Sequence, residues 1–95
     1  MQKRVLPLSC AIPGTQTAVT AFVYGPADAA RHIYLQASLH ADELPGSLTA
    51  YHLCQRLEKL EAQGGLTAKI TVVPLCNPLG LRQSVLYGGV GRFDL

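Results

Sequence analysis

The pattern of apolar and polar positions predicts three strands in the first forty residues. Runs rich in β-branched, aliphatic and aromatic residues are separated by Pro-Gly and Gly-Pro pairs, which commonly form turns. The predicted strands are residues 4–11, 17–25 and 32–39. Because a short connection joins the first two strands, we expect them to pair antiparallel.

A helix with one apolar stripe is predicted after the third strand. Pro45 suits the first helical turn, where its missing N–H costs no hydrogen bond, and a Gly-Gly pair at 64–65 ends the helix. Apolar residues between them recur with the 3.6-residue period of a helix: Ala50, Leu53, Cys54, Leu57 and Leu60. Residues 69–75 are almost continuously apolar, as in a strand buried on both faces. Residues 76–95 show no clear period and are predicted to be mostly loop.

The order strand, helix, strand over residues 32–75 predicts a βαβ unit with two parallel strands. We therefore expect an α/β fold in which an antiparallel hairpin precedes the βαβ unit in one mixed sheet. In open α/β sheets, ligands bind at the carboxyl ends of the strands. His40 and Glu43 follow the third strand, and Asn77 follows the fourth. These three residues are predicted to face one crevice.

Composition and charge narrow the class of function. The 95 residues carry eight Lys/Arg and six Asp/Glu, for a formal net charge of +2, so neither nucleic-acid nor membrane-surface binding is expected. Three widely spaced cysteines, Cys10, Cys54 and Cys76, form no CxxC pair and fit reduced thiols in a cytoplasmic protein. Charged residues make up 15% of the chain, below the roughly 25% of typical soluble domains. Such a composition suits a piece of a larger domain, or a chain covered by a partner.

His40 and Glu43 are spaced to bind one metal ion. Residues three apart in a tight turn lie on the same side, so an imidazole nitrogen and a carboxylate oxygen can converge. Nitrogen and carboxylate ligands favour zinc over magnesium or calcium, and a catalytic zinc usually has three protein ligands and a water. The alternative is structural: Asp42 caps the helix, Glu43 lies at its positive end, and His40 is an ordinary loop residue.

The segments "LHADELPG", "CNPLGLR" and "GRFDL" together resemble the succinylglutamate desuccinylase/aspartoacylase family, relatives of the zinc carboxypeptidases. The resemblance covers roughly residues 33–95 and implies the N-terminal part of a zinc-carboxypeptidase-like mixed sheet, with His40 and Glu43 as zinc ligands. It also implies a third histidine ligand, an Asn-Arg pair for the substrate carboxylate and a glutamate general base, all later than Leu95. We therefore expect residues 1–95 to be a single partial domain that ligates one zinc ion incompletely and contains no catalytic residue.

The parent enzyme implied by the resemblance hydrolyses an amide bond of an N-acylated amino acid or a related small carboxylate. Arg92, Arg82 and Asn77 are candidates for binding this small-molecule substrate; the alternatives are two exposed loop arginines and a turn-forming asparagine. His32 and His52 fall at predicted surface positions and are not expected to replace the third ligand. A second hypothesis is non-catalytic: a small α/β domain that forms a homo-oligomer through an exposed sheet edge.

Overall fold

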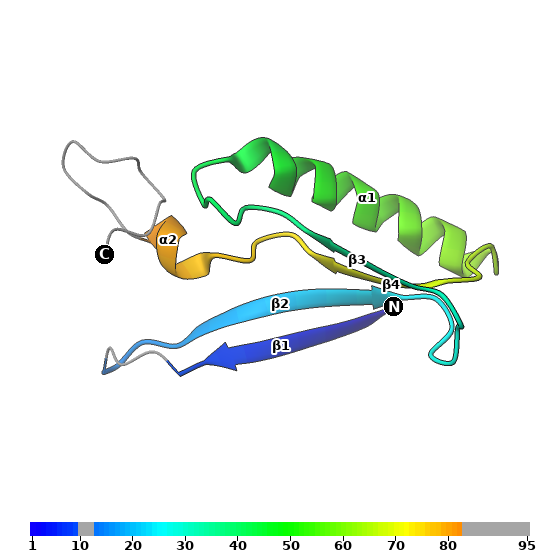
Figure 1. Cartoon of the computed structure of the whole chain (residues 1–95), viewed down its shortest axis with the longest axis horizontal. Helices are drawn as coiled ribbons and strands as arrows, with labels where there is room; N and C mark the ends of the chain where they lie inside the picture. Colours follow the sequence, from blue (N-terminus) through cyan, green and yellow to red (C-terminus); the bar gives the residue numbers. More distant parts are fainter. Residues whose placement is uncertain (10–12, 83–95) are drawn as a thin grey trace.

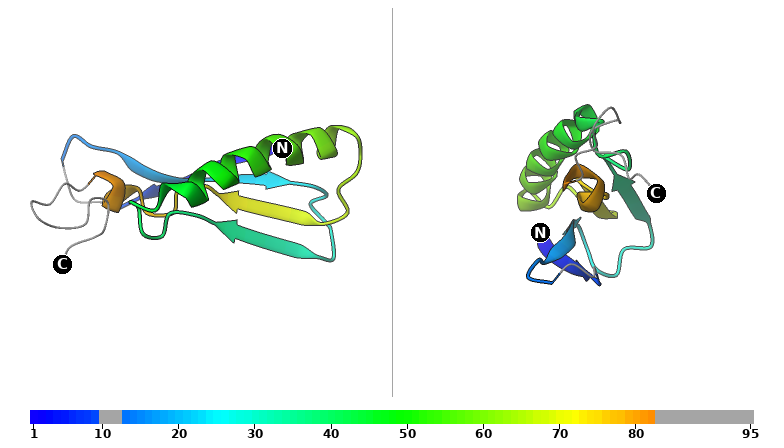
Figure 2. Two further views of the ribbon diagram at one scale, coloured as in Figure 1. Left: turned by 90° about the horizontal axis from the view of Figure 1, so that it is seen from above. Right: turned by 90° about the vertical axis from the view of Figure 1, so that its left-hand side faces the viewer.

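A four-stranded mixed sheet with one long helix along one face organises the part of the chain that the structure describes, residues 1–9 and 13–82 (Figure 1, Figure 2). The structure is a computed structural model of the whole chain. Its elements, in chain order, are β1 (Gln2–Leu8), β2 (Thr17–Tyr24), β3 (His32–Gln36), α1 (Leu44–Ala62), β4 (Lys69–Val73) and α2 (Pro78–Arg82). The predicted α/β fold, with a hairpin before a βαβ unit, is confirmed.

The strand order in the sheet is β1-β2-β4-β3. β1 and β2 pair antiparallel, β2 and β4 also pair antiparallel, and β3 and β4 pair parallel with Ile33 opposite Ile70. Both pairings predicted from the sequence, the antiparallel hairpin and the parallel pair, are therefore present. β3 ends at Gln36 rather than at residue 39, because Ser38 adopts a φ of 54°, which lies outside the extended region of the backbone.

The core lies between α1 and the strands that it covers. Tyr24 and Val72 from the sheet are buried against Ala50, Cys54 and Leu57 from the helix. These three helical residues belong to the predicted apolar stripe; of its other two members, Leu53 is half-buried and Leu60 remains 36% exposed. Among the described residues, no helix is both long and apolar enough to cross a membrane.

Two sequence predictions about the later elements need correction. In β4, only Val72 and Val73 are buried and the first three residues are half-buried, so the strand is not enclosed along its whole length. The prediction of loop after residue 76 is wrong for Pro78–Arg82, which form the short helix α2. Asn77 caps this helix, since its side-chain oxygen accepts a hydrogen bond of 2.8 Å from the Gly80 N–H.

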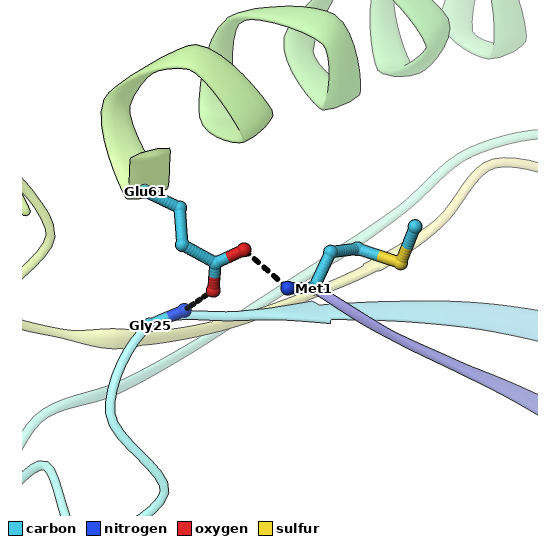
Figure 3. A network of polar contacts seen from close by, with 3 residues as sticks. All are labelled: Met1, Gly25 and Glu61. Atoms are coloured by element: carbon cyan, nitrogen blue, oxygen red, sulfur yellow. Dashed lines mark hydrogen bonds and ion pairs between the residues drawn. The ribbon is translucent and has the colours of Figure 1, made fainter. Parts of the chain in front are cut away.

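The end of the sheet opposite the carboxyl ends of β3 and β4 is held by Glu61, near the end of α1. One carboxylate oxygen of Glu61 accepts the Gly25 N–H at 2.8 Å, and the other pairs with the α-ammonium group of Met1 (Figure 3). The hydrogen bond from the ammonium group and that from Gly25 lower the pKa of Glu61. One carboxylate thus ties α1 to the ends of both hairpin strands.

Candidate functional site

The loop between β3 and α1 begins at the carboxyl edge of the parallel pair. The strand ladder continues past the end of β3, because the Ala37 N–H donates to the Val73 carbonyl at 2.9 Å and the Cys76 N–H donates to the Ala37 carbonyl at 3.0 Å. The segments that follow β3 and β4 are therefore bonded to each other. This places the loop with His40 beside the segment with Asn77, as the parallel topology predicts.

His40 and Glu43 lie at the two ends of a tight turn within this loop. The Glu43 N–H donates to the His40 carbonyl at 3.0 Å, and Nδ1 of the His40 ring is 3.3 Å from Oε2 of Glu43. Both side chains are more than half exposed, at 53% and 60%, whereas Ala41 inside the turn is buried. The turn is thus packed onto the protein while its imidazole and carboxylate face each other at the surface.

The start of α1 is relevant to the alternative in which Asp42 and Glu43 serve only to begin the helix. The helix has Glu43, not Asp42, as its N-cap residue, and the side chain of Glu43 makes no capping hydrogen bond. Its carboxylate faces His40 instead. The orientation of the Glu43 carboxylate toward His40 agrees with the predicted shared ligand.

The two donor atoms fit the geometry of a zinc site. Donors at about 2.0–2.2 Å from a tetrahedral zinc ion lie about 3.4 Å from each other, and the observed separation of Nδ1 and Oε2 is 3.3 Å. An imidazole and a carboxylate are also donor types that zinc accepts. Among residues 1–9 and 13–82, no three His, Cys, Asp or Glu side chains gather at one point, and the assignment of His40 and Glu43 as zinc ligands stays a prediction.

Asn77 joins this loop to α2. Its side-chain nitrogen donates to the Leu39 carbonyl at 3.1 Å, while its side-chain oxygen caps α2 through Gly80. Asn77 thus fixes the backbone residue that immediately precedes His40. Both polar atoms of the amide take part in these structural bonds, and a contact between Asn77 and a substrate stays a prediction.

Arg82, His32 and His52 belong to elements outside the turn formed by residues 40–43. Arg82 is at the end of α2, where Nη1 donates to Oγ1 of the buried Thr17 at 2.7 Å, and Arg92 lies outside the described residues. His32 is exposed at the opposite end of β3 from the turn, and His52 is exposed on α1 with its ring against Tyr51. Neither histidine lies in the turn formed by residues 40–43.

Two serines near the turn were missed by reasoning from the sequence. Oγ of the buried Ser38 is 2.5 Å from Oγ of Ser47, and Ser47 in turn donates to the Pro74 carbonyl at 2.6 Å. These bonds connect the loop, α1 and the segment after β4. Small polar residues on either side of a His-x-x-Glu turn were the available signal, but they are too common in loops to be distinctive.

The chain is similar to proteins of one known family. The model of the succinylglutamate desuccinylase/aspartoacylase catalytic domain matches residues 29–93. The chain belongs to this family. A crystal structure of a succinylglutamate desuccinylase/aspartoacylase family protein from Shewanella amazonensis SB2B is 30% identical, with a TM-score of 0.79 over 99% of the present chain and 25% of that protein. The chain therefore spans a quarter of the length of this family member, and no curated protein matches it.

Proposed function

We propose that the chain is the N-terminal segment of a zinc-dependent hydrolase that cleaves an amide bond of an N-acylated amino acid or a related small carboxylate. Membership of the family indicates a succinylglutamate desuccinylase/aspartoacylase-like hydrolase. The observation that carries the zinc assignment is the facing pair of His40 Nδ1 and Glu43 Oε2, 3.3 Å apart and exposed beside the end of β3.

In this proposal, His40 and Glu43 supply two of the protein ligands, and the longer polypeptide supplies the third ligand and the general base. A bound zinc ion polarises a carbonyl group and lowers the pKa of a coordinated water to about 7. The turn formed by residues 40–43 brings the two donor groups within 3.3 Å of each other. Its exposure leaves room for the remaining ligands and for a substrate to approach.

Arg92 and Arg82 are our candidates for binding the carboxylate of the substrate. A guanidinium group has five N–H donors and can bind a carboxylate through two of them. The hydrogen bond from Arg82 to Thr17 does not exhaust these donors. Arg82 also lies on the helix that Asn77 joins to the His40 loop, which supports a place for it near this edge of the sheet.

Zinc content tests the ligand assignment. We propose that this chain is part of a longer polypeptide. That complete polypeptide should be purified with His40→Ala or Glu43→Ala, and its zinc content measured by inductively coupled plasma mass spectrometry. His52→Ala and Glu58→Ala are matched controls, since these residues are exposed on α1. We expect zinc to be lost from the first two variants and kept in the controls. Unchanged zinc in both His40→Ala and Glu43→Ala would contradict the assignment.

A non-catalytic function is favoured by the contrast between the two edges of the sheet. β1 carries Lys3, Arg4 and Pro7, all residue types that discourage pairing at an edge. β3, at the other edge, reads HIYLQ, with no lysine, arginine or proline and all five residues exposed. We propose that the 95-residue chain, when separate from a longer protein, forms a homo-oligomer by pairing two β3 strands.

Light scattering after size-exclusion chromatography tests this second proposal. The 95-residue chain should elute as a dimer or larger, and Tyr34→Lys at the centre of β3 should shift it to a monomer. Tyr51→Lys is the control, because Tyr51 on α1 is similarly exposed, at 56% against 60% for Tyr34. A wild-type chain that remains monomeric at every concentration excludes the proposal.

A further inference from the structure

A short chain of hydrogen bonds crosses from the His40 loop through α1 to the segment after β4. Ser38 Oγ lies 2.5 Å from Ser47 Oγ, and Ser47 Oγ lies 2.6 Å from the Pro74 carbonyl oxygen. Ser38 is 6% exposed and Ser47 is half-buried. Water therefore has little access to Ser38, whose hydroxyl depends on these protein partners.

The direction of these bonds follows from the count of protons. A carbonyl oxygen can only accept, so the single hydroxyl proton of Ser47 is donated to Pro74. Ser47 then has no proton for Ser38, and the Ser38 hydroxyl must donate to Ser47. Two hydrogen bonds in series polarise one another and strengthen the chain. The Glu43 carbonyl oxygen is 3.5 Å from Ser38 Oγ. This distance is at the outer limit for a hydrogen bond, so the carbonyl is at most a second, weaker acceptor for the Ser38 hydroxyl.

The backbone of Ser38 needs this support. Its φ of 54° is in the left-handed region, which a residue with a side chain adopts only where surrounding contacts hold it. His40 is two residues further along the chain. If Ser38 relaxed to an ordinary conformation, the path of the backbone into the turn would change, and the imidazole would no longer face Glu43.

We propose that Ser47 is a positioning residue for the turn formed by residues 40–43, acting through Ser38 and anchored on the Pro74 carbonyl. Its importance for metal binding rests on the proposed function above, whereas its effect on the turn does not. Ser47 thereby couples the helix and the end of β4 to the orientation of His40 and Glu43.

Hydrogen exchange of the Glu43 amide tests the proposal, because this N–H closes the turn on the His40 carbonyl. In the isotope-labelled 95-residue chain, Ser47→Ala should speed this exchange by about tenfold and leave the β4 amides at their wild-type rates. Thr49→Ala is the matched control: its hydroxyl, also in the early turns of α1, donates to the Pro45 carbonyl and should leave the Glu43 amide unchanged. Ser47→Thr keeps a hydroxyl and should restore slow exchange.

Two results would overturn the proposal. One is a Glu43 amide that exchanges at the wild-type rate in Ser47→Ala, and the other is an equal acceleration in β4, which would indicate a general loss of stability. If Ser47→Ala does not fold, Ser38→Gly removes the hydroxyl while tolerating the left-handed φ, and the same two criteria apply to it. None of these measurements involves zinc, so failure here is distinguishable from failure of the ligand assignment, which depends on the zinc content of His40→Ala.

Discussion

Replacing Gly25 by alanine should damage the fold far more than the same replacement at Gly14. Both glycines have a φ of 81°, so both substitutions place an alanine in the left-handed region. At Gly14 an added Cβ would have nothing within 4 Å, whereas at Gly25 it would overlap the backbone oxygen of Ala68 and lie 3.1 Å from its carbonyl carbon. The pair separates the effect of φ from the effect of the close contact.

The size of each effect can be estimated. A left-handed alanine costs about 1–2 kcal/mol at either position. At Gly25 the obstacle is backbone, so the end of β2 or the segment leading into β4 must shift, which costs about 1–3 kcal/mol more. The same shift endangers the hydrogen bond from Gly25 to Glu61. We therefore expect Gly25→Ala to lower the free energy of unfolding by about 2–5 kcal/mol, up to the whole stability of a small domain.

Urea denaturation followed by far-ultraviolet circular dichroism measures both variants under the same conditions. Gly14→Ala should unfold in one transition with a slightly lowered midpoint, and Gly25→Ala should be largely unfolded before urea is added. Equal losses of stability in the two variants would refute the reasoning, because they would show that φ alone decides and that the contact with Ala68 relaxes at little cost.

Two further predictions concern titratable side chains near the core. The α-ammonium group of Met1 and the Gly25 N–H lower the pKa of Glu61 in the folded chain. The Glu61 carboxylate therefore stabilises the fold at a pH above its ordinary pKa, and this contribution is lost as the pH falls through the lowered pKa. Urea midpoints compared at about pH 6 and about pH 3 should differ less in Glu61→Gln than in the wild type, and an unchanged difference would contradict the role of this carboxylate. Burial raises the pKa of Tyr24, and the neighbouring Cys54 thiol raises it further, but the hydroxyl makes no hydrogen bond of normal geometry among the described residues. Tyr24→Phe should thus leave the unfolding free energy unchanged or raise it by about 1 kcal/mol, and a clear loss would mean that the hydroxyl has a stabilising partner.

The sequence predicted the elements whose signals are local. The apolar period of α1, the turn glycines and the short hairpin connection are written within a few residues of where they act, and the parallel pairing follows from the order of the elements. The end of β3 could not be predicted in this way. The apolar run continues to Leu39, but the conformation of Ser38 is held by Ser47 and, through it, by Pro74, contacts that no local pattern reveals.

In the candidate site, too, the sequence predicted what depends on local spacing and element order, but not what depends on contacts between distant residues. The spacing of His40 and Glu43, together with the topology, predicted a shared position at the carboxyl edge, and the structure brings their donor atoms to 3.3 Å. The role of Asn77 in fixing the Leu39 carbonyl depends on a bond across 38 residues and was not predicted. The short helix α2 was missed because Asn-Pro was interpreted as a turn, although the same pair can begin a helix.

The central place of β4 in the sheet has a consequence during synthesis of the chain. β2 and β3 do not touch in the strand order and are joined only through β4, which is the last of the four strands to leave the ribosome. A nascent chain arrested before Lys69 would hold a hairpin and a separate strand with a helix, but no common sheet. Their apolar faces then stay uncovered until five residues, Lys69–Val73, emerge, so this interval is when the nascent chain is most exposed to aggregation or to capture by a chaperone.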